Sequence, residues 1–190
     1  MNTYFTLAVD AEVSLVAPTL SMAQEIFDLV DSDRPHLRKF LDFVDDTKEA
    51  EDEKKYLQAK LSCWLQETDR LFCIAYQGQL VGSIDLHFIN LTHKKGEIGY
   101  WLHSDYTKKG IMKRAVLKVC ELAFTEMGLN KLSIVADVDN EPSNAVARSC
   151  GFSLSGTEPK DVLLYGEYRD MNRYALLKED FLKSSSAVGQ

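Results

Sequence analysis

Five positions near the middle of the chain combine a glycine with four positive charges at the start of a helical pattern. They are Lys108, Lys109, Gly110, Lys113 and Arg114. Glycine lets backbone N–H groups approach an anion closely, and the first turn of a helix offers unpaired amides and the positive end of the helix dipole. The pattern favours a phosphate site of the kind that a pyrophosphate or a 3′-phosphate requires. Taken alone, it is more typical of the start of an exposed helix.

A second segment, VDNEPSNAVARSCGF over 138–152, places polar residues directly after a predicted strand. Asn140 stands where a helix cap or a ligand contact is expected, and Pro142 fits the first helical turn. Ser143 adds a hydroxyl at the same end. Considered singly, Asn140 is more typical of a turn or an N-cap, and Ser143 of a solvated hydroxyl.

Together and in this order, the two segments resemble the acetyl-CoA signature of the GNAT superfamily. GEIGYWLHSDYTKKGIM over 96–112, followed by VDNEPSNAVARSCGF, is similar to the RimL/RimJ-like branch, whose best-known members acetylate the N-termini of ribosomal proteins. The resemblance is tight from Glu97 to Phe152 and follows the order of elements along nearly the whole chain. It implies an N-acetyltransferase with acetyl-CoA as co-substrate and no metal.

The resemblance also implies the residues that contact acetyl-CoA. They are Leu102, whose region supplies an amide to the acetyl carbonyl, the loop residues Lys109, Gly110, Ile111 and Met112, and Asn140 with Ser143. Two positions depart from the family pattern. Met112 replaces a Gly or Ala and narrows the space near the coenzyme, and Ala147 replaces a tyrosine that protonates the departing thiolate in many members. The RimL-like pattern nominates Ser143 instead, mainly as a hydrogen-bond donor, because a serine hydroxyl is a poor acid.

Glu97 opens the predicted strand EIGYWLH and matches the glutamate that several GNAT enzymes use as a base through water. Strand geometry places Glu97 on one face with Gly99, Trp101 and His103. Because apolar residues flank Glu97, we expect its pKa to be raised towards a value useful for proton transfer. The alternative is a solvated glutamate at the start of a strand.

Other residues are weaker candidates. His103 shares the face of Glu97 but closes a strand, Cys150 is typical of packing at a helix end, and Glu167 lies in a predicted turn. The acidic run from Asp42 to Glu53 could steer a cationic acceptor. Such a run is more often the solvated face of a helix.

Hydrophobic periodicity predicts the elements that position these residues. A strand over 4–9, helices within 19–65, a hairpin over 71–90 that turns at Gln77-Gly78-Gln79, and a strand over 97–103 precede the glycine loop. A helix over 111–127, a strand over 131–138, a short helix over 141–150 and a strand pair over 152–164 and 168–177 follow it. The order is that of a mixed α/β (α+β) fold, and the resemblance implies the GNAT fold, a twisted, mostly antiparallel sheet of about seven strands flanked by helices. We expect one domain over 1–183 and a frayed tail over 184–190.

Composition argues against several classes of protein. The chain has 190 residues, 45% of them hydrophobic, and a formal net charge of −7, whereas a nucleic-acid binder needs clustered Lys and Arg. No apolar run is long enough to cross a bilayer and no signal-peptide pattern opens the sequence, so we expect a cytoplasmic protein. The four cysteines and four histidines are dispersed without the spacing of a metal site or a disulfide framework.

The resemblance predicts direct transfer of an acetyl group to a primary amine, with a protein N-terminal α-amine of the ribosomal-protein type as the favoured acceptor. An α-amine has a pKa near 8 and is partly neutral at cytoplasmic pH, so a strong base is not required. A polyamine, an aminoglycoside or an amino acid is the first alternative acceptor. A non-catalytic acyl-CoA-binding protein is the second alternative, and the final strands are compatible with a homodimer.

Overall fold

The computed structural model describes residues 5–187, which form two compact units. The first unit runs up to Asp85 and includes Tyr100–Ala115, and the second comprises Leu86–Gly99 and the residues from Val116 onward. Three elements contribute residues to both units: β4 (Gln79–Asn90), β5 (Lys95–Leu102) and α4 (Ile111–Glu121). The glycine loop therefore belongs to the first unit, and Glu97, Asn140 and Ser143 belong to the second.

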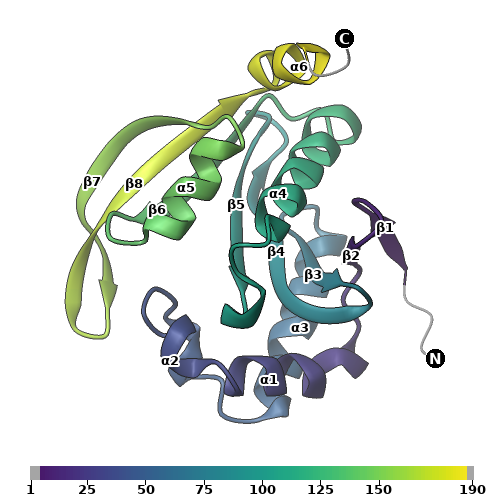
Figure 1. Ribbon diagram of the computed structural model, residues 1–190, viewed down its shortest axis with the longest axis vertical. Coiled ribbons are helices and arrows are strands. Elements are labelled where there is room, and N and C mark those ends of the chain that lie inside the picture. The colour runs from purple at the N-terminus through teal and green to yellow at the C-terminus, as the bar shows by residue number, and fades with distance from the viewer. Residues whose placement is uncertain (1–4, 188–190) are drawn as a thin grey trace. The chain divides into compact units, whose positions relative to one another are not determined.

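Eight strands occur in the described residues, and their hydrogen-bonded order is β1-β2-β3-β4-β5-β6-β8-β7 (Figure 1). The strands not yet defined are β1 (Thr6–Ala8), β2 (Val13–Val16), β3 (Arg70–Tyr76), β6 (Lys131–Asp137), β7 (Ser153–Leu164) and β8 (Glu167–Leu177). The pairs β1–β2, β2–β3, β6–β8 and β7–β8 are antiparallel, and β5–β6 is parallel. The predicted α/β fold with a mostly antiparallel sheet is confirmed.

The N-terminal region contains one strand more than the sequence predicted. The Asp10 carboxylate accepts hydrogen bonds from the backbone amides of Glu12 (2.8 Å) and Val13 (2.9 Å), which closes a turn after β1. The chain returns as β2, in which Val13 and Leu15 are 1% and 0% exposed. Because four residues are too few for a clear period, pattern analysis missed β2, and the sheet has eight strands where about seven were expected.

Two hairpin turns have the backbone that a two-residue connection requires. Gln77 and Gly78 both have positive φ, 51° and 82°, as do Tyr165 and Gly166, 49° and 86°. Positive φ at both central positions is the type I′ geometry, whose twist matches that of the flanking strands. The predicted turn between β3 and β4 is therefore confirmed, with Gln79 as the first residue of β4.

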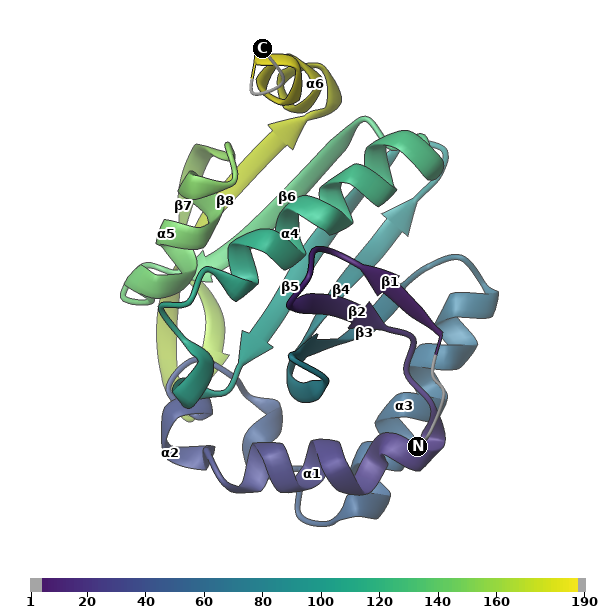
Figure 2. The same cartoon turned by 45° about the vertical axis from the view of Figure 1, so that its right-hand side comes forward.

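Helices of the first unit pack on its strands. They are α1 (Ala23–Asp31), α2 (Arg34–Leu37) and α3 (Ala50–Leu65), with 3₁₀ turns at Leu20–Met22, Phe43–Asp45 and Ser104–Tyr106. α1 and α3 lie side by side (Figure 2). A capping box joins Glu49 and Asp52 at the start of α3, and the carboxylates of its first turn suit the positive end of the helix dipole.

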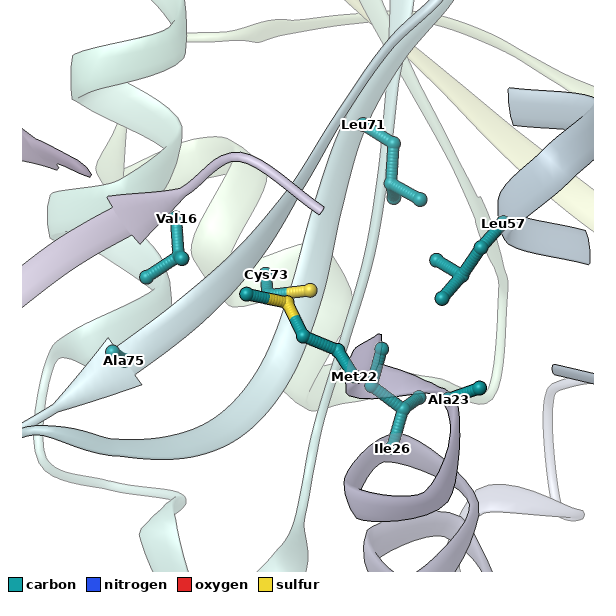
Figure 3. Packing of buried hydrophobic residues seen from close by; sticks show 8 residues of the cluster. All are labelled: Val16, Met22, Ala23, Ile26, Leu57, Leu71, Cys73 and Ala75. Carbon is teal, nitrogen blue, oxygen red and sulfur yellow. The ribbon is translucent and has the colours of Figure 1, made fainter. Parts of the chain in front are cut away.

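A hydrophobic cluster joins these helices to β2 and β3 (Figure 3). Its buried members are Val16, Met22, Ala23, Ile26, Leu57, Leu71, Cys73 and Ala75. Trp101 at the end of β5 packs against this cluster, and it also packs against a second one formed by Val30, Leu37 and Val44. The side chain next to Leu102 is thus held by the helical layer of the first unit.

The second unit contains α5 (Glu141–Ser149), α6 (Lys178–Ala187) and a π-helical turn over Leu122–Glu126 that continues α4. Gly128 ends this segment with a φ of 68°, the left-handed backbone that is common after the end of a helix. The rings of Phe124 and Phe181 lie 5.4 Å apart, which fixes α6 beside the π-helical turn. α6 includes residues 184–187 of the expected tail, and 188–190 lie outside the described residues.

Candidate active site

The loop before α4 has an open, strained backbone. Lys108 and Gly110 have φ values of 61° and 70°, and no heavy atom of the described chain lies within 4 Å of the place where a Cβ would stand at Gly110. The first hydrogen bond of α4 runs from the Arg114 amide to the Gly110 carbonyl, 3.2 Å. The amides of Ile111 and Met112 lie in the first turn of α4, where no carbonyl of the preceding helical turn is available to accept them.

The cations of this loop are not equivalent. The Lys109 ammonium lies 5.0 Å from the centre of the Tyr106 ring and 5.8 Å from that of Tyr76, so two aromatic faces hold it at the loop. Arg114 instead forms ion pairs with Asp10 (2.8 Å) and Glu12 (3.3 Å). The charge of Arg114 is thus matched by two carboxylates of the first unit, and its predicted contribution to an anion site stays a prediction.

Met112 and Ile111 are 7% and 1% exposed. Their side chains pack in the interior, so at both positions the main chain is the part left for a ligand. The departure of Met112 from the family pattern is accommodated by the core of the protein.

The backbone around Leu102 depends on a glycine of β4. A Cβ at Gly82 would lie 2.2 Å from the Trp101 carbonyl oxygen and 2.9 Å from the Leu102 Cα. Only glycine allows β5 to come this close, and the next residue, His103, donates its amide to the Val81 carbonyl at 2.9 Å. Sequence reasoning missed Gly82, for which an isolated glycine in a strand pattern was the only signal.

His103 is buried and both nitrogens of its ring are engaged. Nδ1 accepts a hydrogen bond from the Asp105 amide (3.2 Å), and Nε2 lies 3.3 Å from Ser32 Oγ, which itself donates to the Leu29 carbonyl at 3.0 Å. Both ring nitrogens of His103 are therefore occupied by neighbouring groups of the protein in this arrangement.

Glu97 is the centre of a polar network in the second unit. Its carboxylate lies 3.0 Å from Arg173 Nη1, 3.2 Å from Ser133 Oγ and 3.4 Å from His87 Nε2, and its side chain is 19% exposed. Arg173 also binds Glu158, with two contacts of 3.1 Å. Neither Arg173 nor His87 was predicted, because they are distant from Glu97 in the sequence.

The network reverses the expected pKa of Glu97. Burial raises the pKa of this carboxyl, but the hydrogen bond and charge of His87, the charge of Arg173 and the Ser133 hydrogen bond outweigh burial and lower it. The prediction of a raised pKa is wrong, because strand patterning shows the apolar neighbours of Glu97 and not the cation brought from β8. Glu97 is an ionised, hydrogen-bonded carboxylate at neutral pH.

A pocket of about 380 Å³ lies beside this network, wholly within the second unit. Residues that line it include Phe88, Lys95, Glu97, Lys131, Ser133 and Arg173. Lys95 and Lys131 are direct partners in the parallel pairing of β5 with β6, which runs only from this pair to Glu97 and Ser133. Beyond these residues the two strands have no ladder with each other in the described chain, so the main chain of β5 from Ile98 onward loses its β6 partner.

Asn140 and Ser143 lie at the start of α5. Asn140 is the N-cap, because its Oδ1 accepts the Ser143 amide at 3.2 Å. Beside it, Asn144 is 1% exposed and donates to the carbonyls of Asp137 (2.9 Å) and Asn140 (2.8 Å). The Asn144 side-chain oxygen accepts from Asn172 and Tyr174, and this satisfied network ties α5 to β8.

The remaining candidates lie apart from these groups. Cys150 is 5% exposed at the C-terminal end of α5, as expected for packing. Glu167 opens β8 and is exposed, with its carboxylate 3.8 Å from Arg169. Neither residue adds a group to the loop or to the Glu97 network.

Comparison with known proteins identifies the family. The family model described as the acetyltransferase (GNAT) domain matches residues 13–153. This chain belongs to the GNAT acetyltransferase family. The chain is 30% identical over 181 residues to the putative ribosomal N-acetyltransferase YdaF of Bacillus subtilis, an alignment that covers 93% of this chain and 97% of that protein.

Other GNAT acetyltransferases align with a smaller part of the chain or have a lower sequence identity to it. The spermidine N(1)-acetyltransferase of Escherichia coli K12 is 27% identical over 124 residues, which cover 65% of this chain and 67% of that protein. A structure of RimL, the ribosomal L7/L12 α-N-protein acetyltransferase in complex with coenzyme A, superposes with a TM-score of 0.88 at 26% identity. The superposition covers 91% of this chain and 98% of that chain.

Membership of the GNAT acetyltransferases confirms the acyltransferase class and the RimL-like resemblance of the Glu97–Phe152 segment. Within residues 5–187, no group of His, Cys, Asp and Glu has the geometry to hold a metal ion. None of the helices in that range is long and apolar enough to cross a membrane.

Proposed function

We propose that this GNAT acetyltransferase moves an acetyl group from acetyl-CoA directly to a primary amine, and that the acceptor is a protein N-terminal α-amine of the ribosomal-protein type. The observation that supports binding of the coenzyme is the open loop at Gly110, which is followed by the first-turn amides of Ile111 and Met112 in α4. The names of YdaF and RimL support the acceptor. A ribosomal acceptor would place the reaction in the cytoplasm.

The loop residues would hold the pyrophosphate of acetyl-CoA through main-chain amides of Lys109, Gly110, Ile111 and Met112. Lys109 supports this role because its ammonium is held at the loop by Tyr76 and Tyr106. The space at Gly110 fits an anion that approaches the backbone closely.

An amide near Leu102 would polarise the acetyl carbonyl, as the backbone constrained by Gly82 supports. Asn140 would donate a hydrogen bond from its side-chain nitrogen to the coenzyme, because its Oδ1 already accepts the hydrogen bond that caps α5. Ser143 would donate a hydrogen bond to the departing thiolate.

To act on the amine through water, Glu97 would have to give up hydrogen bonds that hold its carboxylate. Its partners Arg173, Ser133 and His87 favour a role in which the carboxylate orients the surrounding groups. As a base, Glu97 would have to accept a proton against its lowered pKa.

We also propose that residues 1–183 act as a single GNAT domain. One family model matches 13–153, a range with residues from both units, and three elements run through both. A homodimer remains a prediction, which the exposed face of β7 allows.

A polyamine is the second candidate acceptor. The spermidine acetyltransferase relative and the net charge of −7 favour it, since an acidic protein attracts a polycation. Release of coenzyme A with spermidine and kanamycin, against peptides that start with Ser or Ala, separates the candidates. Turnover only with the peptides supports the N-terminal acceptor, and turnover only with spermidine replaces it.

Binding of acetyl-CoA tests the coenzyme independently of the acceptor. We expect acetyl-CoA to raise the melting temperature of the wild-type protein. Stabilisation without turnover across the amine panel would favour the non-catalytic alternative. Absence of both stabilisation and turnover would refute the proposed function.

A further inference from the structure

α3 buries a carboxylate on the face that packs against the core. Glu53 is 5% exposed and stands one helical turn before Leu57, which is 1% exposed. Residues four apart lie on the same side of a helix, and Leu57 points into the cluster of Met22, Ile26 and Cys73 (Figure 3). Glu53 is therefore the member of the acidic run 42–53 that faces inward.

Glu53 differs from the other buried acids in lacking a partner. Asp33 accepts two hydrogen bonds from Ser104, at 2.7 and 2.8 Å, and Asp137 is paired with Arg169 at 2.6 Å. Within residues 5–187 the Glu53 side chain has neither a hydrogen bond nor an ion pair. No fully buried side-chain oxygen of the described residues lacks a hydrogen-bond partner, so the unpartnered Glu53 oxygens reach accessible space. A cationic ligand there would offset the cost of holding this charge among largely buried groups.

The surroundings of Glu53 keep its proton affinity high. Burial, followed by the negative charge of Asp52, raises the pKa of Glu53 from 4.5 to about 7. The other ionisable groups near it are Tyr56 on α3, Cys73 on β3 and, beside Cys73, Glu25 on α1. Around Tyr56 lie Lys60, 5.8 Å from its ring, and Asp69 and Asp85. Lys60 forms ion pairs with Asp69 (3.4 Å) and Asp85 (2.8 Å), so its charge is matched by those two carboxylates.

Glu53 belongs to the helical layer that packs against the end of β5. Cys73, whose thiol feels the charge of Glu53, belongs to the cluster against which Trp101 packs. Trp101 is followed by Leu102, the residue proposed to present its amide to the acetyl carbonyl. The helical layer that carries Glu53 thus borders that part of β5, entirely within the first unit.

We propose that Glu53 contacts the acceptor amine and receives its proton. This inference rests on the proposed function, because it assigns a residue to the amine in that reaction. The Glu53 carboxylate takes one proton from the ammonium and later releases it to water. The amine nitrogen then bonds to the acetyl carbon, the carbon–sulfur bond breaks, and the second proton passes from nitrogen to the leaving thiolate.

The test compares Glu53→Gln with Glu97→Gln and with Glu51→Gln as a matched control. Glu51 is an exposed neighbour on α3 that pairs with Lys54 at 3.1 Å. For the full-length protein with acetyl-CoA and the amine that gives turnover, we expect Glu53→Gln to lower kcat about 10²-fold or more, the usual contribution of a general base. We expect Glu51→Gln to retain wild-type kcat and KM.

The pH dependence separates proton transfer from a structural role. In the wild type, kcat/KM, which reports the free enzyme, should rise as the pH increases through about 7, the pKa of Glu53, and this rise should disappear in Glu53→Gln and persist in Glu97→Gln. Unchanged binding of acetyl-CoA to Glu53→Gln shows that the variant is folded. Glu53→Asp should recover part of the lost kcat.

Two outcomes would overturn the inference. One is a Glu53→Gln variant with wild-type kcat, and the other is loss of the rise in Glu97→Gln while Glu53→Gln keeps it. Both require an active wild type, whereas failure of the proposed function appears as a wild type without turnover on any amine.

Discussion

At the scale of single residues, the contact between Glu97 and Arg173 is the one that most changes the role predicted for Glu97. Glu97 was expected to be a group poised for proton transfer, and Arg173 makes it the anion of an ion pair at 3.0 Å. Replacement of Arg173 by Met should destabilise the fold by about 1–2 kcal/mol at pH 7, because a largely buried carboxylate loses a charged donor while exposure of the arginine screens part of the attraction.

The sign of the pH effect follows from the lowered pKa of Glu97. A carboxyl with a lowered folded-state pKa stabilises the protein above its unfolded pKa, near 4.5, and this contribution is lost as the pH falls through the folded value. Urea unfolding should therefore show the full difference between wild type and Arg173→Met at pH 7 and a smaller one near pH 4. Lys131→Gln, at the same pocket, is the control and should change little.

Glu53 should have the opposite pH dependence. A carboxyl whose pKa rises from 4.5 to about 7 on folding stabilises the protein below pH 4.5, and that contribution is lost as the pH rises through 7. The Glu53→Gln variant has no carboxyl to ionise at this position, so it does not lose this stability as the pH rises. The stability of the variant relative to wild type should thus increase between pH 4.5 and 7 by an amount on the order of 3 kcal/mol.

Urea unfolding of both proteins at several pH values measures the difference. The curves should run in parallel above about pH 8, where Glu53 is ionised in both states. A constant difference across the whole range would show that the Glu53 carboxyl is not shifted by its surroundings.

At the scale of elements, the approach of β5 to β4 depends on Gly82. Gly82→Ala would place a Cβ 2.2 Å from a backbone oxygen that no side-chain rotation can move. We expect a loss of about 3 kcal/mol or more, together with impaired turnover, because the backbone at Trp101 and Leu102 must shift. Gly156→Ala in β7, where the space is open, should stay within about 0.5 kcal/mol of wild type. Equal effects of both substitutions in urea unfolding would contradict the close approach.

The sequence was sufficient for elements with a regular period or a defined turn chemistry. The stripe of α4, the Gln77-Gly78 turn and the Asn140 cap are local features, and each is present as predicted. What could not be predicted depends on contacts between distant residues. Arg173 reaches Glu97 from another strand, and the hydrogen bonds of His103 come partly from α1. Glu53 could not be distinguished from its acidic neighbours, because only the packing of α3 determines which carboxylate is buried.

At the scale of the whole molecule, the two units share β4, β5 and α4, which links their folding. Neither unit can lose its strands without breaking an element of the other, so we expect one cooperative transition. Both tryptophans, Trp64 and Trp101, belong to the first unit, so their fluorescence reports that unit alone, whereas far-ultraviolet circular dichroism reports both.

The two signals should therefore give coincident urea transitions, and acetyl-CoA should move both equally. At a concentration of one hundred times its Kd, a ligand that binds only the folded protein adds about 2.7 kcal/mol. Because Lys109–Met112 lie in the first unit, a coenzyme held by this loop moves the dichroism transition of the second unit only if the two units unfold together. If acetyl-CoA moved the fluorescence transition and left a separate dichroism transition in place, the units would fold independently and the expectation of one cooperative transition would be wrong.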